Sequence, residues 1–560
     1  METTSTTGAA PPGDRDHEDV GPILVPGETC WRTAHADRFG RIVDGADYLR
    51  HVKSAMLGAS RRIMIIGWDL DYRTPFEAGD AELPGPNHLG PFLHWLVWQR
   101  PDIEVYLLKS NLRLLAAFDG FWFGVAPVTL VNRITSSRMH FAVDGAHPTG
   151  AVHHQKIVVV DDAVAFCGGI DLTIGRWDTR AHLGDDPRRS AAGSSYGPRH
   201  EVATVVDDDA ARALAEVARD RWHAATGESL EPVHANRTFW PPAVTQPLRN
   251  VEVGIARTLP APPAPTEIRE IEALDLAAIA AARDTIYLEN QYLAARSLAE
   301  ALAARLKEPD GPDVVIVLPR SSESRLEQRS MDSARERLLR LLWRSDLHGR
   351  LGVYWPVADG GTSVYVHSKV MVIDDRLLRI GSSNLNNRSL GFDSECDVVL
   401  EAVPGTPGYD DLRREIETAR DDLVSEHLGV SIDVFRTDMA QRGSFVGSVN
   451  GLRTAGRSLR RLTRSMVAAD AGPFGENDLM DPSHVPASVG ESVYSLVTGV
   501  VTWPLTRLAP QTLSAVRWIA GTVASAAADT LGWEALPEFV RSASMVLRDD
   551  DPDAYVAQHS

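Results

Sequence analysis

A short polar pattern occurs twice in this chain, and its repetition limits the folds that the chain can adopt. The pattern is a histidine, a lysine two positions later and an aspartate seven positions after the histidine. It begins at His154 and again at His367. Both copies lie in runs of apolar, β-branched residues. One such pattern alone is weak evidence, but the same arrangement twice in the same context indicates a duplicated unit.

The duplication extends beyond this pattern. A predicted helix at residues 46–58 precedes a predicted strand at 61–71, and a helix at 274–284 precedes a strand at 285–293. A further buried strand opens with Pro-Asp in each half, at residues 101–111 and 312–322. Short apolar strands between helices are typical of layered α/β folds. We therefore predict two similar α/β sandwich halves with mixed sheets, related by a pseudo-twofold axis.

Changes in composition divide the chain into four predicted regions. We expect a disordered segment at residues 1–25, a first half at 26–240, a second half at 241–430 and a helical C-terminal extension at 431–560. Five arginines recur at helical spacing between residues 453 and 464, and residues 492–533 are apolar and contain tryptophan. Two interpretations of the extension stay open: helices packed on the catalytic body with a solvated arginine face, and association with an anionic membrane surface.

Charge and cysteine content exclude some classes of protein. The chain has 57 Lys and Arg against 76 Asp and Glu, a net charge of −19, which argues against a nucleic-acid partner. Three widely spaced cysteines predict a reducing compartment without a disulfide framework. We expect neither a signal peptide nor a transmembrane helix. The predicted location is the cytoplasm, with the inner membrane face as the site of any peripheral association.

The duplicated residues suit the cleavage of a phosphodiester. This reaction needs a nucleophile, a proton donor for the leaving alkoxide and positive charge on the phosphoryl oxygens. If the two halves face each other, His154 and His367 supply the first two, and Lys156 and Lys369 supply the charge. One site then forms within one chain, so no oligomer is required. We expect no cofactor and no metal, because the lysines would repel a cation and no close Cys/His ligand set is visible in the sequence.

Each histidine also needs a carboxylate to orient its ring. Glu395 is the candidate for the second half and Glu201 for the first. Their spacing from the histidines differs because the first half carries an insertion at residues 175–197, which we predict to be a loop over the site entrance. Asp161 and Asp374 fall at an odd offset on their strands, on the opposite face from the histidines, so we assign them a structural role.

Together with GGIDL at residues 168–172, GRWD at 175–178 and IYLENQYL at 286–293, these motifs resemble the phospholipase D superfamily over residues 35–430. The resemblance is closest to the phosphatidylcholine-hydrolysing branch, although His200-Glu201 stands where that branch usually has His-Asp. It implies a duplicated α/β fold with one shared active site, a phosphohistidine intermediate and no catalytic metal.

The resemblance also implies individual roles. His154 would be the nucleophile and His367 the general acid, although pseudo-symmetry makes the reverse assignment nearly as good. Lys156, Lys369 and Asn384 would hold the phosphate oxygens, and Ser382 and Gly169 would line the substrate site. Asp171 occupies the position equivalent to Asn384 but cannot donate a hydrogen bond unless protonated, so it is left out of the phosphate site.

The predicted function is that of a phospholipase D, acting peripherally on a membrane surface. It would hydrolyse the distal phosphodiester of glycerophospholipids to phosphatidate and the head-group alcohol. The alternative is a phosphatidyltransferase of the cardiolipin-synthase kind. A nuclease of the same superfamily and a membrane-binding protein with a vestigial site are the remaining candidates. The acidity of the chain argues against the first of these, and the intact duplicated pattern argues against the second.

Overall fold

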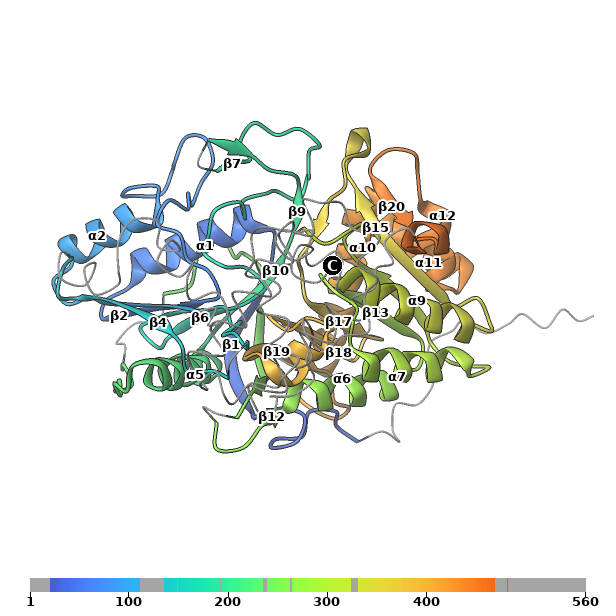
Figure 1. Ribbon diagram of the computed structural model, residues 1–560, viewed down its shortest axis with the longest axis horizontal. Helices are drawn as coiled ribbons and strands as arrows, with labels where there is room; N and C mark the ends of the chain where they lie inside the picture. Colours follow the sequence, from blue (N-terminus) through green and yellow to red (C-terminus); the bar gives the residue numbers. More distant parts are fainter. Residues whose placement is uncertain are drawn as a thin grey trace, which may run out of the picture.

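The computed structural model describes residues 21–110, 135–148, 150–191, 193–234, 239–261, 264–323, 331–468 and 481. Figure 1 shows two α/β lobes side by side, with the first half of the chain in one lobe and the second half in the other. Of the N-terminal segment predicted to be disordered, residues 1–20 lie outside the described residues.

Two long strands join the lobes. β1 (Arg32–Val43) and β11 (Leu248–Leu259) pair antiparallel at the centre of a 16-stranded mixed sheet. Outward from β1 the strands are β10 (Val202–Asp207), β6 (Val164–Gly168), β5 (Ile157–Val160), β2 (Arg62–Gly67), β3 (Glu104–Ser110) and β4 (Met139–Asp144). Outward from β11 they are β19 (Glu395–Glu401), β18 (Leu377–Gly381), β17 (Val370–Ile373), β13 (Thr285–Glu289), β14 (Asp313–Val317) and β15 (Leu351–Val357).

The two series match in order and direction. Strands β2, β3 and β4 run parallel to one another, and so do β13, β14 and β15. The strands nearer the centre are antiparallel in both halves. The predicted α/β class with mixed sheets is confirmed, and the sheets of the two halves are continuous through β1 and β11. The pseudo-twofold axis stays a prediction.

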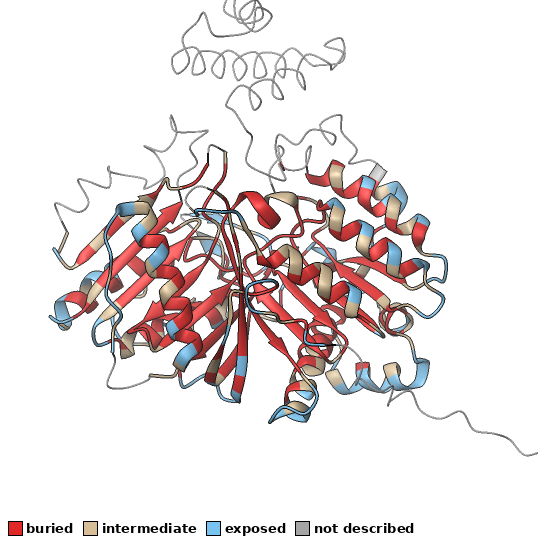
Figure 2. Cartoon of the chain, turned by 90° about the horizontal axis from the view of Figure 1, so that it is seen from below, coloured by how far each residue is buried: buried red, intermediate tan, exposed pale blue. Residues whose placement is uncertain are grey.

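Helices cover the sheet. In the first half these are α1 (Gly45–Gly58), α2 (Leu89–Gln99) and α5 (Asp208–Thr226). In the second half they are α6 (Glu270–Ala281), α7 (Arg296–Lys307), α9 (Ser333–Ser345) and α10 (Tyr409–Leu428). The strands are buried and the outer faces of the helices are exposed (Figure 2). The helices predicted at residues 46–58 and 274–284 correspond to α1 and α6, because apolar residues at helical spacing identify a face that packs on the sheet.

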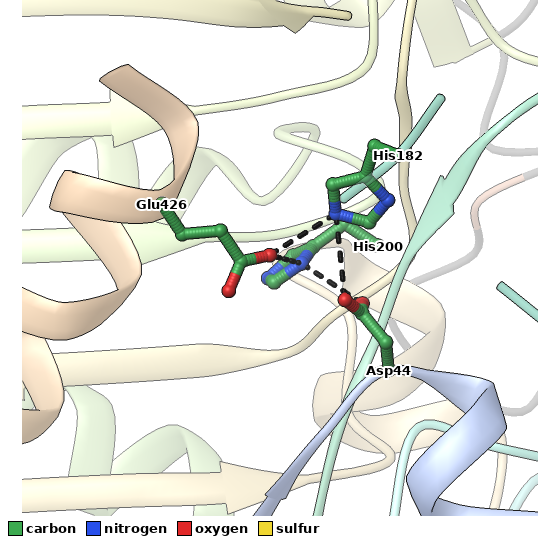
Figure 3. Close-up of side chains that lie close together, drawn as sticks. All are labelled: Asp44, His182, His200 and Glu426. Carbon is green, nitrogen blue, oxygen red and sulfur yellow. Dashed lines mark hydrogen bonds and ion pairs between the residues drawn. The ribbon is translucent and has the colours of Figure 1, made fainter. Parts of the chain in front are cut away.

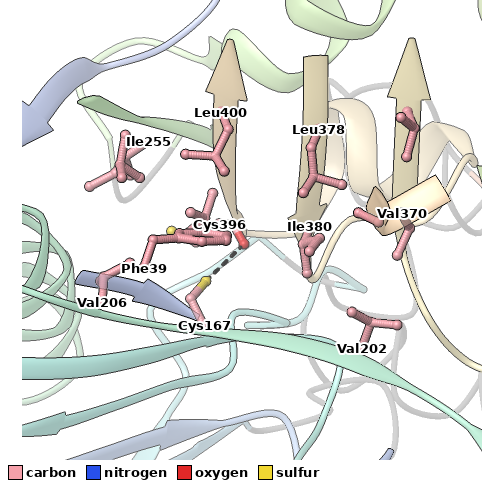
Figure 4. Close-up of a cluster of buried hydrophobic side chains, with 14 of the residues drawn as sticks. Phe39, Cys167, Val202, Val206, Ile255, Val370, Leu378, Ile380, Cys396 and Leu400 are labelled. Carbon is pink, nitrogen blue, oxygen red and sulfur yellow. Dashed lines mark hydrogen bonds between the residues drawn. The ribbon is translucent and has the colours of Figure 1, made fainter. Parts of the chain in front are cut away.

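The hydrophobic core is shared between the lobes. Figure 4 shows Phe39 and Val206 of the first half packed in one cluster with Leu378 and Leu400 of the second. In the same cluster the Cys167 thiol donates to the carbonyl oxygen of Cys396 at 3.4 Å. All three cysteines are buried and free of disulfides. The halves therefore associate through packed side chains as well as through the β1–β11 ladder.

The described part of the C-terminal region packs on the second half. α11 (Ile432–Arg442) and α12 (Phe445–Leu452) bury Phe435 and Phe445 in the shared core. The helix predicted from the arginine spacing at 453–464 is wrong over most of its length. β20 (Ser458–Arg461) instead pairs antiparallel with β15, because the sheet edge offers backbone groups that a strand can satisfy. Only α13 (Arg464–Ala468) is helical there. The apolar segment at 492–533 lies outside the described residues.

Among the described residues, none of the helices combines the length and the apolar character needed to cross a membrane.

Candidate active site

The histidine-bearing segment of each half lies beside the carboxylate-bearing segment of the other half. β9 (Arg199–His200) pairs in parallel with β16 (Tyr365–Val366), and the backbone amide of His367 donates to the carbonyl of His200 at 2.8 Å. The first-half histidine makes the equivalent contact with the second half: the backbone amide of His154 donates to the carbonyl of Ser394 at 3.0 Å. These two exchanges of backbone hydrogen bonds bring both motifs to the junction of the lobes.

This exchange decides which carboxylate orients which histidine. Nδ1 of His154 lies 2.9 Å from Glu395 Oε1, and Nδ1 of His367 lies 3.1 Å from Glu201 Oε2. The sequence-based pairing within each half is therefore wrong, because each carboxylate is carried across the junction to the histidine of the other half. In both rings, a carboxylate at Nδ1 leaves Nε2 as the nitrogen that can meet a substrate.

Both carboxylates are fully buried and held by further contacts. The hydroxyls of Ser382 and Ser389 donate to Glu395. Glu201 instead faces two cations, with its Oε1 at 3.7 Å from Arg176 and 3.8 Å from Arg199. Ser382 thus holds a carboxylate behind the histidine, which differs from its predicted role in lining the substrate site.

The two lysines flank the histidines and are almost fully buried. Lys156 Nζ donates to the carbonyl of His154 at 2.9 Å and lies 3.4 Å from Asp171. Lys369 Nζ donates to the carbonyl of its own motif histidine at 2.6 Å and to Gln291 at 3.3 Å. Asp171, which the sequence left out of the phosphate site, therefore balances the charge of a lysine.

Two further predicted residues lie at the same junction. A Cβ atom at Gly169 would lie 3.2 Å from the carbonyl oxygen of His367, a tight contact at the place where the two halves approach. Asn384 is 5% exposed, and among the described residues its side-chain oxygen has no hydrogen-bond partner. A buried amide in this state can bind an incoming polar group.

The aspartates of the motifs lie elsewhere, at the starts of β2 and β13. Asp161 accepts hydrogen bonds from the backbone amides of residues 60, 61 and 62 at 2.6–2.8 Å. Asp374 accepts from the amides of residues 283, 284 and 285 at 2.7–2.9 Å. Each carboxylate fixes the connection between a helix and the strand that follows it.

Burial controls the protonation of the site. It lowers the pKa of His154 and of His367 well below the ordinary value, and nearby lysines lower both further. Burial also raises the pKa of Glu395 to about 8, and it raises that of Glu201. Each histidine–glutamate pair therefore favours a net neutral state in which the two groups share one proton.

The lysine of each half acts electrostatically on the histidine of the other half. Lys369 of the second half lowers the pKa of His154, and Lys156 of the first half lowers the pKa of His367. An anionic phosphodiester bound among these groups would favour charged lysines and a protonated imidazole. The arrangement thus offers candidates for a nucleophile, an acid and a cationic cradle at one junction.

Sequence reasoning missed three residues of this site. Arg176 and Arg199 face Glu201, and Ser389 donates to Glu395 at 2.6 Å. Arg176 lies in the GRWD segment, which is one of the motifs visible in the sequence. Its distance from His154 along the chain does not predict its contact with Glu201. The insertion at 175–197 also differs from the predicted entrance loop, because it sends buried His182 and Arg189 into the interior.

The sequence shows no close Cys/His ligand set, but within the described part of the chain the fold brings distant residues into a group that could hold an ion. Directly behind Glu201, the fold gathers four buried side chains, Asp44, His182, His200 and Glu426, with ligand atoms within 4.8 Å of one another. Asp44 and Glu426 are far from the two histidines in the sequence, which is why spacing alone did not reveal the group.

Comparisons with known proteins find relatives named as phospholipases D and a related family model. A family described as "Cardiolipin synthase, PLD-like domain" matches residues 276–417. Phospholipase D1 of Schizosaccharomyces pombe (strain 972 / ATCC 24843) is 24% identical over 532 aligned residues, which cover 73% of this chain and 37% of that protein. Phospholipase D alpha 2 of Arabidopsis thaliana is 24% identical, with 71% of this chain and 66% of that protein covered. The chain thus spans less than two thirds of the length of these relatives.

Among solved structures, phosphatidylserine synthase of Haemophilus influenzae Rd KW20 has a TM-score of 0.49 and 12% sequence identity. The match covers 70% of this chain and 88% of that one.

Proposed function

The chain belongs to the phospholipase D superfamily, and from this premise we propose that it hydrolyses the distal phosphodiester of glycerophospholipids, giving phosphatidate and a head-group alcohol. One observation carries the proposal: two histidines at one junction, each held through Nδ1 by a buried glutamate of the opposite half. We place the reaction at a membrane surface reached from the cytoplasm, where such lipids are available.

The first step forms a covalent intermediate. Nε2 of His154 attacks phosphorus, a nitrogen–phosphorus bond forms, and the bond from phosphorus to the head-group oxygen breaks. The proton on Nε2 of His367 passes to that leaving oxygen. Lys156, Lys369 and Asn384 hold the non-bridging oxygens as their charge increases.

The second step restores the enzyme. His367, now neutral, takes a proton from water as the water oxygen attacks phosphorus. The nitrogen–phosphorus bond breaks, phosphatidate leaves and His154 is free again. In both steps Glu395 accepts a hydrogen bond from the Nδ1–H group of His154, which keeps Nε2 as the reactive nitrogen.

A phosphatidyltransferase is the second candidate, supported by the match to a family described as "Cardiolipin synthase, PLD-like domain". The covalent intermediate would be the same, and an alcohol would replace water in the second step. Vesicles of phosphatidylglycerol alone separate the two: phosphatidate and glycerol indicate hydrolysis, whereas cardiolipin and glycerol indicate transfer.

The test of the main proposal uses the full chain and vesicles of mixed phospholipids. We expect release of phosphatidate by the wild type and its loss in His154→Ala and His367→Ala, with His51→Gln, a buried histidine outside the site, as control. Mass spectrometry of protein quenched with substrate should find a phosphatidyl group on His154, accumulating in His367→Ala with an activated ester. Phosphatidate release that survives either alanine variant would refute the proposal.

A further inference from the structure

Four buried side chains converge behind the active site, and three of them come from the first half. Asp44 precedes α1, His182 belongs to the insertion and His200 lies in β9, whereas Glu426 projects from α10 of the second half (Figure 3). Their exposures are 1%, 1%, 0% and 9%. His200 is the chain neighbour of Glu201, so this cluster adjoins the carboxylate that orients His367.

The facing atoms of the cluster alternate between nitrogen and oxygen. His182 Nε2 lies 3.4 Å from Asp44 Oδ2 and 3.1 Å from Glu426 Oε1. His200 Nδ1 lies 3.1 Å from Asp44 Oδ1 and 3.4 Å from the same Glu426 oxygen. Around a tetrahedral zinc ion with bonds of about 2.0–2.1 Å, neighbouring ligand atoms lie about 3.3–3.4 Å apart. The four nitrogen–oxygen distances in the cluster are close to these edges, and Asp44 faces one histidine with each of its two oxygens.

Hydrogen bonding within the described residues accounts for only part of the cluster: His182 Nε2 pairs with Glu426 Oε1, and the amide of Glu201 donates to Asp44 Oδ1. Asp44 Oδ2 and His200 Nδ1 have no hydrogen-bond partner there, although both are buried and lie close to opposite charges. Buried polar atoms are rarely left in this state. A cation at the centre of the four side chains would give each of these atoms a partner.

The outer nitrogens of both rings support the same conclusion. His182 Nδ1 lies 2.9 Å from Asp178, and His200 Nε2 lies 3.1 Å from Glu289. Histidines that bind metals almost always donate their second N–H group to a carboxylate or carbonyl, which fixes the ring and its tautomer. Asp178 is held in turn by Arg189 at 3.1 Å. Both rings are thus oriented with one nitrogen outward to a carboxylate and the other inward to the cluster.

We propose that Asp44, His182, His200 and Glu426 bind one zinc ion. Two imidazoles and two carboxylates at tetrahedral spacing suit zinc, and the two carboxylates balance its charge. Four protein ligands leave no open position, so the ion is structural. It connects the first half to α10 directly behind Glu201. Arg180, which is partly exposed, is paired with the second oxygen of Glu426.

The experiment measures metal in the full chain, expressed without an affinity tag and purified without metal resin. We expect one zinc ion per chain by elemental mass spectrometry, and at least a tenfold loss in His182→Gln and in Glu426→Gln. His51→Gln and His367→Asn serve as matched controls that keep the zinc, the second showing that the ion is not bound by the active-site histidines.

A second measurement decides the question even where a ligand variant fails to fold. Metal-free wild-type protein is titrated with Co²⁺, and the intense visible absorption of tetrahedral cobalt is expected, with loss of that absorption when Zn²⁺ is added. A wild type that contains no zinc and binds neither ion would overturn the proposal and leave an ion-pair network of protonated histidines. Zinc that is lost in His367→Asn but kept in His182→Gln would also overturn it. These results do not depend on the lipid substrate.

Discussion

Glu201 and Glu395 differ in the step that each should support, because each orients the histidine of the opposite half. Glu201 holds His367, the proposed acid, and Glu395 holds His154, the proposed nucleophile. With a phosphodiester substrate whose leaving group is choline, Glu201→Gln and Glu395→Gln should both lower kcat by about 100-fold or more. With a p-nitrophenyl ester, whose leaving oxygen needs no proton, Glu201→Gln should recover most of its activity and Glu395→Gln should not.

The comparison of the two esters also tests the assignment of roles. Recovery in Glu395→Gln alone would make His367 the nucleophile. An equal response of both variants would contradict the separation of roles between the two pairs.

The pH dependence of the rate should reflect the titration of the His154–Glu395 pair. Burial raises the pKa of Glu395 to about 8 and lowers that of His154, so the pair holds an extra proton below about pH 8. Attack by Nε2 requires that this proton be lost, so kcat/KM of the wild type should rise with pH toward about 8. In Glu395→Gln the imidazole titrates alone, and the rising limb should move to lower pH by at least about one unit, with a lower maximum. A limb that stays in place would assign it to another group.

At the scale of elements, the aspartates of the two motifs connect helices to strands. Asp374 accepts three backbone hydrogen bonds ahead of β13 and has a φ of 52°, a left-handed conformation. Asp374→Ala should lower the stability of the full chain by about 2–4 kcal/mol, since it leaves buried amides unpaired and strains the backbone. Asp374→Asn, which keeps an acceptor and tolerates this φ, should lose about half as much. Urea unfolding compares the two, and equal losses would contradict the role of these hydrogen bonds.

The order of these elements could be predicted from the sequence, because the spacing of apolar residues reports local geometry. The strands β2 and β13 and the helices α1 and α6 lie where that spacing placed them. Contacts across the junction could not be predicted in this way. His154 and Glu395 are separated by 241 residues, and His182 and Glu426 by 244. Strand β20 was missed for a related reason: the sheet edge that it completes belongs to a distant segment.

At the scale of the whole molecule, the shared core and the β1–β11 ladder make the two halves one unit with one site. His154→Ala and His367→Ala should each lower activity by about 10³-fold or more, and the double variant should be no worse, because both act in one mechanism.

An equimolar mixture of the two single variants should stay inactive, since every chain then carries one damaged site. Activity measured in the mixture before and after unfolding and refolding together checks this. Recovery on simple mixing would show that halves are exchanged between chains, with the site completed by a partner.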